Sequence, residues 1–190
     1  QEMPARSASI TADQARHAIG STDHVHLGPL HPLDLATDLL RLLQKEKPVV
    51  SLDVQGYIRR VDRGRVRQKT GISQRLNRAL LASSVIKGDR AEIQAILDGR
   101  QITIEDLICL YGLDEVVITA GSEGGRIIQA TGQVVIYDVV NVNQVIDTTG
   151  AGDVFFAAYL VSRIHRGQTI RESCEHAAFV VAQHLSGLYI

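Results

Sequence analysis

A glycine-rich string with a carboxylate at each end is the part of the sequence best suited to chemistry. It runs from Asp147 to Asp153 in the order Asp-Thr-Thr-Gly-Ala-Gly-Asp, directly before a segment with helical spacing. Gly150, Ala151 and Gly152 have little or no side chain, so their backbone N–H groups can approach a ligand closely. At the start of a helix such N–H groups lack partners and attract anions. The string therefore predicts a pocket for a phosphate group.

Asp153 falls in the first turn of the expected helix. The helix dipole favours an ionised carboxylate at that position, and an ionised carboxylate can take a proton from an attacking hydroxyl. We therefore interpret Asp153 as a general base beside the anion pocket. A structural interpretation stays open, in which Thr149 is a simple N-cap, the glycines form a tight turn and Asp153 only complements the dipole.

Other segments could contact a nucleotide or a metal. Thr119 to Gly124 reads T-A-G-S-E-G after a β-branched segment, although taken alone it could be any strand that ends in a glycine turn. Asp89 and Glu92 stand at the start of another expected helix, where Asp89 could be the N-cap. Arg59 follows a buried strand and could contact a phosphate through its planar guanidinium, but exposed arginines are usually solvated.

Composition and motifs exclude several classes of protein. The chain has 190 residues, 45% of them hydrophobic, with 20 Lys and Arg against 21 Asp and Glu, so no net field favours nucleic acid or an anionic membrane surface. The basic stretch from Arg59 to Arg78 lacks interleaved aromatic residues and is expected to be solvated or to face a nucleotide. His24, His26 and His31 lack a fitting fourth ligand, which disfavours a metal site. No G-x-x-x-x-G-K-[ST] string is present, which excludes a P-loop.

Apolar stretches and cysteines in the sequence indicate the cellular compartment. No stretch reaches the ~18 apolar residues of a membrane span, and residues 1–9 have no apolar signal-peptide core. Cys109 and Cys174 lie far apart without C-x-x-C spacing, which is typical of reduced thiols. We therefore expect a cytoplasmic protein.

Segments of strand character alternate with helical ones. The expected strands are 24–28, 48–53, 84–87, 115–119, 126–130 and 133–137, and the expected helices are 33–43, 74–82, 90–97, 104–111, 153–166 and 170–185. Thr131-Gly132 suits a tight hairpin between the last two strands. This alternation predicts an α/β fold with a mostly parallel central sheet covered by helices on both faces. Without repeats or linkers, residues 1–190 are expected to form a single domain.

The string from Asp147 to Asp153 resembles the second signature of the PfkB, or ribokinase-like, carbohydrate kinase family at nearly every position. Ala158 stands where the family usually has a glycine. The resemblance runs from about His24 to the C-terminus and implies a three-layer α/β/α ribokinase-like fold. It also implies that the family's N-terminal strands and small β-lid are missing from this chain, whose first residue is Gln1 rather than Met.

The resemblance implies an ATP-dependent kinase that transfers the γ-phosphate to a hydroxyl of a sugar, polyol or nucleoside. Asp153 would be the base, with Gly150, Ala151 and Gly152 as the anion hole. The residues implied for nucleotide binding are Thr119, Gly121, Gly124, Asp147 and Thr149.

Glu92, with Asp89 in place of the family's usual asparagine, would organise Mg²⁺ and phosphate. Arg59 would contact a phosphate, and a monovalent cation is a further candidate cofactor. Relatives often form homodimers. The alternative is a catalytically silent nucleotide-binding or structural module of the same fold, and retention of Asp153 beside Gly150 and Gly152 argues against it.

Overall fold

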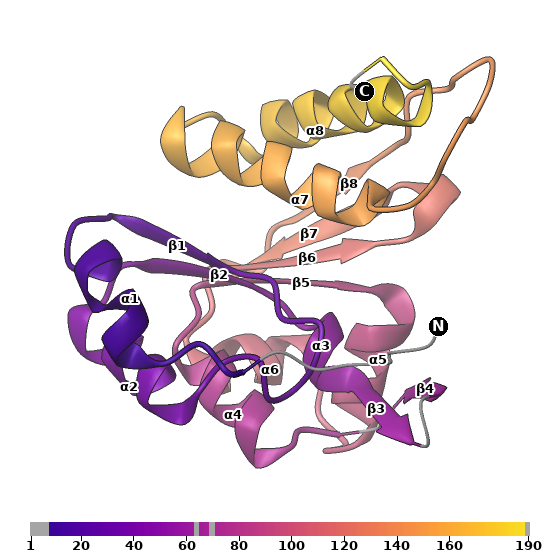
Figure 1. The fold of residues 1–190 in the computed structure, drawn as a ribbon. Coiled ribbons are helices and arrows are strands. Elements are labelled where there is room, and N and C mark those ends of the chain that lie inside the picture. The colour runs from indigo at the N-terminus through magenta and orange to yellow at the C-terminus, as the bar shows by residue number, and fades with distance from the viewer. Residues whose placement is uncertain (1–7, 63–64, 69–70, 189–190) are drawn as a thin grey trace. The chain divides into compact units, whose positions relative to one another are not determined.

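The structure, a computed structural model, describes residues 8–62, 65–68 and 71–188, with the side chains of 8–58 and 71–188. A six-stranded sheet is flanked by helices (Figure 1). Across the sheet the strands are, in order, β1 (His24–Leu27), β2 (Val49–Asp53), β5 (Val85–Asp89), β6 (Glu115–Thr119), β7 (Gly125–Gln129) and β8 (Val134–Tyr137). The chain divides into two compact units, residues 1–117 with 129–132 and residues 118–128 with 133–190.

The first unit is built on parallel strands. β1 pairs with β2 and β2 pairs with β5, both in parallel, and the register aligns Leu27 with Leu52 and Leu52 with Ile86. All three side chains are buried. Such apolar runs are typical of parallel strands that are covered on both faces.

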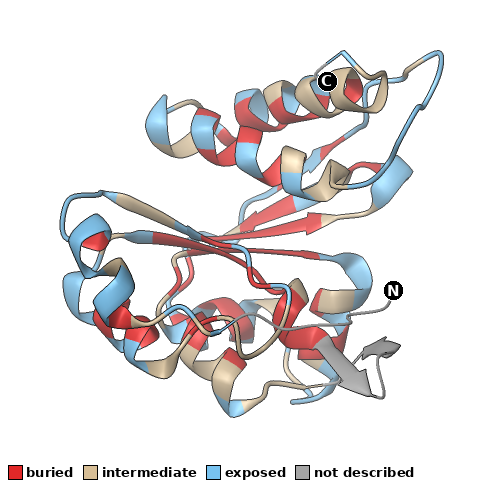
Figure 2. Cartoon of the chain, viewed as in Figure 1, coloured by how far each residue is buried: buried red, intermediate tan, exposed pale blue. Residues whose placement is uncertain are grey.

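The longer helices of this unit gather on one side of these strands (Figures 1 and 2). They are α1 (Ala12–Ile19), α2 (Thr37–Glu46), α4 (Gln74–Leu81), α5 (Arg90–Asp98) and α6 (Ile104–Tyr111). Their buried residues recur at helical spacing, as in Leu39, Leu40 and Leu43 of α2 and Leu76 and Leu80 of α4. These apolar stripes form the core of the first unit.

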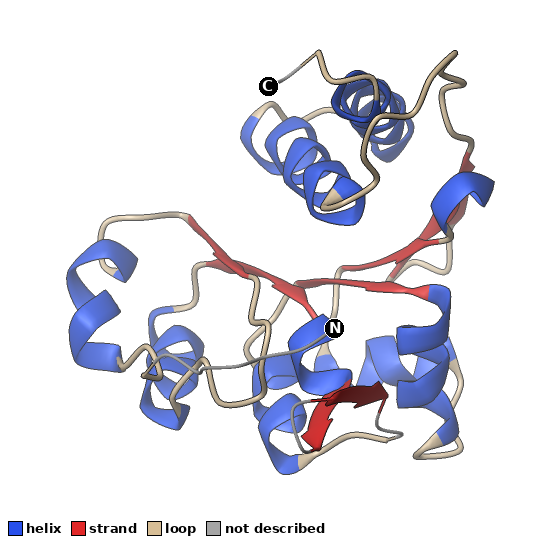
Figure 3. Ribbon diagram, turned by 45° about the vertical axis from the view of Figure 1, so that its right-hand side comes forward, coloured by secondary structure: helices blue, strands red, loops and turns tan. Residues whose placement is uncertain are grey.

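Two short elements follow β2. The single-turn helix α3 (Gln55–Ile58) leads into β3 (Arg59–Asp62), which pairs antiparallel with β4 (Arg65–Gln68) as a separate two-stranded sheet (Figure 3). Gly56 of α3 lies so close to Pro29 that a Cβ would collide with its carbonyl group. Only glycine permits this close approach of two backbones.

The second unit combines a hairpin with two helices. β7 and β8 are antiparallel, with Gly125 opposite Tyr137. The helices α7 (Ala151–Leu160), continued by a π-helical turn (Val161–His165), and α8 (Ile170–Leu185) lie side by side. Tyr137 stacks on Phe155 of α7, with their ring centroids 4.5 Å apart. Burial raises the pKa of the Tyr137 phenol. Aromatic stacking thus fixes α7 against the hairpin.

The expected strands and most of the expected helices are confirmed, and the bounds of 104–111, 115–119 and 170–185 are the same. The helix predicted at 33–43 is wrong in its start, since α2 begins at Thr37. Ile10 forms a β-bridge with Leu35, and its N–H donates to Asp34 O at 2.7 Å, which holds this backbone extended. The Asp34 carboxylate also accepts hydrogen bonds from the N–H groups of Leu30 and His31.

The helix expected at 153–166 also differs, because it begins two residues earlier and its last turn is π-helical. Among the described residues, none of the helices combines the length and the hydropathy needed to cross a membrane. One domain over residues 1–190 stays a prediction.

Candidate active site

The predicted phosphate string forms a tight turn before α7. Asp147 Oδ1 accepts a hydrogen bond from the backbone N–H of Thr149 at 2.8 Å. Hydrogen bonds from Thr149 hold the pKa of Asp147 below its usual value. The N-cap of α7 is Gly150, so the alternative in which Thr149 is the N-cap is wrong.

Gly150 adopts φ 75°, in the left-handed region, and no atom lies within 4 Å of a Cβ built on it. Glycine is therefore favoured by backbone conformation and not by lack of space. The left-handed residue turns the chain into the helix, and Val154 N–H donates to Gly150 O at 2.9 Å.

The first turn of α7 follows directly, with Ala151, Gly152 and the exposed Asp153. Ala151 N–H donates to Thr148 O at 3.3 Å, and the N–H groups that follow it lie at the positive end of the helix dipole, where helices bind anions. One helix turn therefore presents backbone donors and a carboxylate together. Ala158 is buried on the same helix.

Two hydrogen bonds tie the string and the residue before it to α8. His184 Nε2 lies 2.9 Å from the carbonyl oxygen of Thr149, and Ile146 N–H donates to Leu185 O at 2.8 Å. A carbonyl oxygen only accepts, so Nε2 of His184 carries the proton. Sequence reasoning missed His184 because it lies 35 residues from Thr149 and belongs to no motif.

The segment from Thr119 to Gly124 forms a second tight loop in the same unit. β6 ends at Thr119, and a 3₁₀ turn covers Gly121–Glu123. Ala120 N–H donates to Gly124 O at 2.8 Å, which closes the loop. Gly124 has φ 75°, and a Cβ there would collide with Tyr137 O, so this position accepts only glycine.

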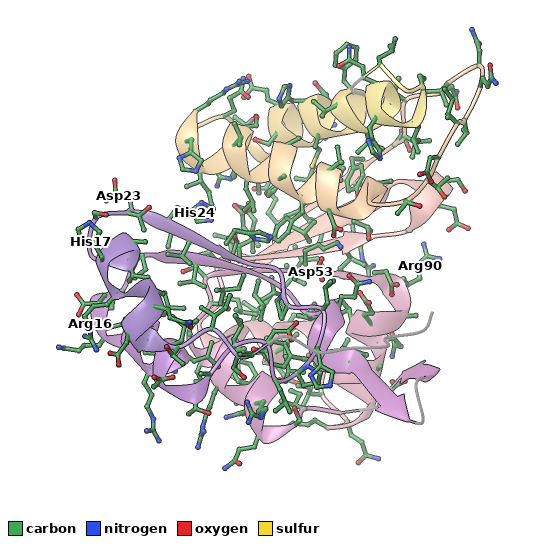
Figure 4. All side chains as sticks on the ribbon, in the orientation of Figure 1. Arg16, His17, Asp23, His24, Asp53 and Arg90 are labelled. Atoms are coloured by element: carbon green, nitrogen blue, oxygen red, sulfur yellow. The ribbon has the colours of Figure 1, made fainter. Side chains whose placement is uncertain are left out.

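In the first unit, the ends of β2 and β5 carry a buried ion pair. Lys87 Nζ donates to Asp53 Oδ2 at 2.6 Å, and both side chains are 7% exposed. The two residues are register partners, and the second carboxylate oxygen of Asp53 accepts from the N–H of Gln55 at 2.9 Å. Asp53 and Arg90, which follows β5, are labelled in Figure 4.

Asp89 and Glu92 form a capping box at the start of α5, as the N-cap interpretation of Asp89 predicted. Glu92 N–H donates to Asp89 Oδ1 at 2.7 Å, and Asp89 N–H donates to Glu92 Oε2 at 2.9 Å. Burial raises the pKa of Glu92, and the Asp89 and Asp53 carboxylates add to this, while the hydrogen bond from Asp89 and the charge of Lys87 oppose it.

These residues can be tested as a magnesium site. Within residues 8–58 and 71–188, Asp89 Oδ2 and Glu92 Oε1 accept no hydrogen bond. No group of three or more His, Cys, Asp or Glu side chains that could hold a metal was found among the described residues. Mg²⁺ usually binds one or two carboxylates together with water and substrate phosphates, so two carboxylate oxygens at the edge of a helix start fit it.

The remaining candidates lie elsewhere. The side chain of Arg59 is outside the described side chains. His24 Nε2 and His26 Nδ1 each lie 2.9 Å from Ser51 Oγ, and His31 Nδ1 accepts from Leu33 N–H at 3.1 Å. The structure thus gives each of the three histidines a hydrogen bond to this unit's own residues.

Solved structures share this fold. A pyrophosphate-dependent kinase in the ribokinase family, complexed with a pyrophosphate analog and myo-inositol, is similar with a TM-score of 0.80 and 20% identity over 97% of this chain and 65% of that chain. Ribokinase of Arabidopsis thaliana, complexed with ribose and ATP, gives 0.69 and 20% over 97% and 56%. A Burkholderia thailandensis nucleoside kinase, complexed with inosine, gives 0.69 and 17% over 88% and 52%.

The chain therefore has the α/β fold of ribokinase-type kinases and spans less than two thirds of the length of these relatives. The chain belongs to the pfkB family of carbohydrate kinases, whose family model matches residues 4–187. The family and the fold class predicted from the sequence are confirmed. No curated protein matches the chain.

Proposed function

We propose that this chain carries the catalytic core of an ATP-dependent kinase that phosphorylates a hydroxyl of a sugar, polyol or nucleoside. The observation that supports it most directly is the helix start at α7, where the left-handed Gly150 precedes backbone N–H groups and Asp153 in one turn. An anion hole and a base within one turn match what phosphoryl transfer to an alcohol requires.

In the proposed reaction Asp153 takes the proton of the acceptor hydroxyl as its oxygen attacks the γ-phosphorus. A new O–P bond forms, the bond from the γ-phosphorus to the bridging oxygen breaks, and ADP leaves with that electron pair. The N–H groups of Gly150, Ala151 and Gly152 stabilise the charge on the transferred group. Asp153 then gives up its proton to solvent or to a departing product.

Other residues have supporting roles in this proposal. Thr119, Gly121 and Gly124 form the closed loop that would contact the nucleotide, and Asp147 with Thr149 would hold its phosphates against α7. Their place in tight turns with left-handed glycines supports this role, because a glycine lets a ligand approach the backbone closely.

On the metal side, Glu92 and Asp89 would hold Mg²⁺ through the oxygens that the capping box leaves available. Bound Mg²⁺ would neutralise the charge of the donor phosphates. Arg59 would contact a phosphate. A monovalent cation is a further candidate cofactor for this site.

The similar structures indicate which substrate classes to test. These structures are complexes with a pyrophosphate analog and myo-inositol, with ribose and ATP, and with inosine, so both kinds of donor and all three acceptor classes belong in the test. We also propose a cytoplasmic homodimer. The free cysteines, exposed Cys109 and buried Cys174, suit a reducing compartment.

The test is an assay of the protein with all of the polypeptide that its gene encodes. It is incubated with Mg²⁺, with ATP or pyrophosphate, and with a panel of sugars, polyols and nucleosides, and product is measured by mass spectrometry. We expect phosphorylation of at least one acceptor, lost in Asp153→Asn. ATP binding without transfer to any acceptor would instead favour the silent module.

A further inference from the structure

Tyr137, the last residue of β8, contacts two separate parts of the candidate active site. One part is the donor loop, residues 119–124, and the other is helix α7, whose first turn carries Asp153. In the proposed reaction both parts contact the same donor. The distance between them therefore decides whether the transferred phosphate can meet the anion hole and the base.

On one side, Tyr137 packs against the closing end of the donor loop. It is the register partner of Gly125, which directly follows Gly124. A Cβ on Gly124 would collide with Tyr137 O, and a Cβ on Gly125 would lie 2.7 Å from Cζ of the Tyr137 ring. Gly124 O accepts the hydrogen bond from Ala120 N–H that closes the loop. The backbone and the ring of Tyr137 thus hold the point at which the loop closes.

On the other side, the Tyr137 ring stacks on α7. Its plane lies 16° from that of the Phe155 ring, with the two centroids 4.5 Å apart, and Phe155 stacks in turn on Tyr159 at 6.3 Å. Phe155 and Tyr159 are four residues apart and therefore lie on one face of the helix. All three residues are buried. This row of rings fixes the rotation and the height of α7 against the hairpin.

The same contact determines the direction of Asp153. Phe155 follows Asp153 by two residues, which is about 200° around an α-helix. Phe155 is buried against the hairpin, whereas Asp153 is exposed. A rotation of α7 that displaced the Phe155 ring would therefore displace the Asp153 carboxylate as well.

We propose that Tyr137 is a positioning residue that sets the distance between the donor loop and the turn that carries the anion hole and the base. It acts through Gly124 and Gly125 on the loop and through Phe155 on the helix, and it contacts neither donor nor acceptor. The inference rests on the proposed function, which assigns the donor loop and α7 to one donor.

The first experiment removes the ring and then restores it. Kinetics are measured with a donor and an acceptor from the assay above. We expect kcat of Tyr137→Leu to fall on the order of 10- to 100-fold, because a misplacement of about 1 Å is enough for such a loss. Tyr137→Phe keeps the stacked ring and should stay within about twofold of the wild type.

Tyr111→Leu is the matched control. Tyr111 and Tyr137 are both 8% exposed, but Tyr111 belongs to α6 in the first unit. Tyr111→Leu should lose a similar free energy of unfolding, measured in urea, and keep the wild-type kcat. A purely structural role of Tyr137 would make the two leucine variants behave alike.

Phe155→Leu removes the other ring of the stack. It should lower kcat as Tyr137→Leu does, and the double variant should lose no more than either single variant, because both changes break one contact. Phe155→Leu decides the matter if Tyr137→Leu does not fold.

Hydrogen exchange measures the same link without the reaction. Ala120 N–H is bonded to Gly124 O in the donor loop, and Val154 N–H is bonded to Gly150 O at the start of α7. We expect both amides to exchange about tenfold faster in Tyr137→Leu, because the packing that limits their local opening is lost. Both should exchange at wild-type rates in Tyr137→Phe and Tyr111→Leu.

A folded Tyr137→Leu protein with the wild-type kcat would overturn the inference. Equal losses of kcat in Tyr111→Leu, additive losses in the double variant or unchanged exchange at both amides would also overturn it. Failure of the proposed function looks different. In that case the wild type phosphorylates no acceptor, while exchange at Ala120 and Val154 still shows whether Tyr137 holds the two parts together.

Discussion

The Nε2 atom of His184 lies 2.9 Å from the carbonyl oxygen of Thr149, the residue before the N-cap of α7. The last turn of α8 therefore positions the turn that begins α7. A second bond, from Ile146 N–H to Leu185 O, acts on the other end of the same segment. These two bonds hold the string against a helix that contributes no motif residue.

Replacement of His184 by alanine should lower turnover more than stability. Loss of this bond costs about 1 kcal/mol, so we expect Tm to fall by about 2–4 °C and kcat to fall about fivefold, because the string that carries Asp153 is no longer held in place. His184→Gln should keep most activity, because its amide can also donate to the Thr149 carbonyl. The matched control is His176→Ala, on the same helix, which should behave as the wild type. Equal kcat values for the alanine and glutamine variants would contradict this role.

Alanine at Gly150 should affect both stability and catalysis. A non-glycine residue in the left-handed region costs about 1–2 kcal/mol, and φ is 75° here. Gly112 offers a matched control, because it has φ 62° at the end of α6 and equally open space around its Cβ. We expect Gly150→Ala and Gly112→Ala to lose similar free energy of unfolding in urea, and only Gly150→Ala to lose kcat. Loss of turnover in both would show that strain alone lowers activity.

Elements with local signals were predictable from the sequence. α6 and α8 begin with capping boxes, formed by Thr103 with Asp106 and by Thr169 with Glu172. The residues at each start therefore indicate where the helix begins. The phosphate string was predictable for the same reason, since the turn and the helix start follow one another along the chain.

Features that depend on distant residues were not predictable. The start of α2 is set by the bridge between Ile10 and Leu35, which no local pattern indicates. The partner of Lys87 follows from the register that aligns it with Asp53, and a strand pattern alone does not give register. A lysine inside an apolar strand does signal a buried partner, and that signal was available at Lys87.

Tyr57 and Tyr111 should respond oppositely to loss of their hydroxyls. Within the described part of the chain Tyr57 Oη is buried without a hydrogen-bond partner, whereas Tyr111 Oη donates to Asn77 Oδ1 at 2.7 Å. Tyr57→Phe should therefore raise the free energy of unfolding by about 1 kcal/mol, and Tyr111→Phe should lower it by about as much. Urea unfolding at neutral pH measures both, and a destabilised Tyr57→Phe would contradict the assignment.

Tyr57 should also govern part of the alkaline unfolding. Burial raises its pKa to about 12, above the value of 10.0 for a free phenol. The folded state therefore holds this proton more tightly than the unfolded state does, and the linked stability is complete below pH 10 and lost as pH rises toward about 12. The loss amounts to about 3 kcal/mol. Tyr57→Phe should show a shallower fall of stability over that range, and an unchanged profile would contradict burial as the cause.

Asp153→Asn tests the proposed base most directly. A general base contributes about 10²- to 10⁴-fold in rate, so kcat should fall by at least about 100-fold, while donor affinity stays within about twofold because the backbone N–H groups of α7 remain. Asp13→Asn is the matched control, since Asp13 is likewise an exposed acid in the first turn of a helix and should leave both quantities unchanged. Stopped-flow turnover and calorimetric donor binding separate the two effects. If the asparagine variant lost donor affinity in proportion to kcat, Asp153 would serve in holding the phosphates and the proton would need another acceptor.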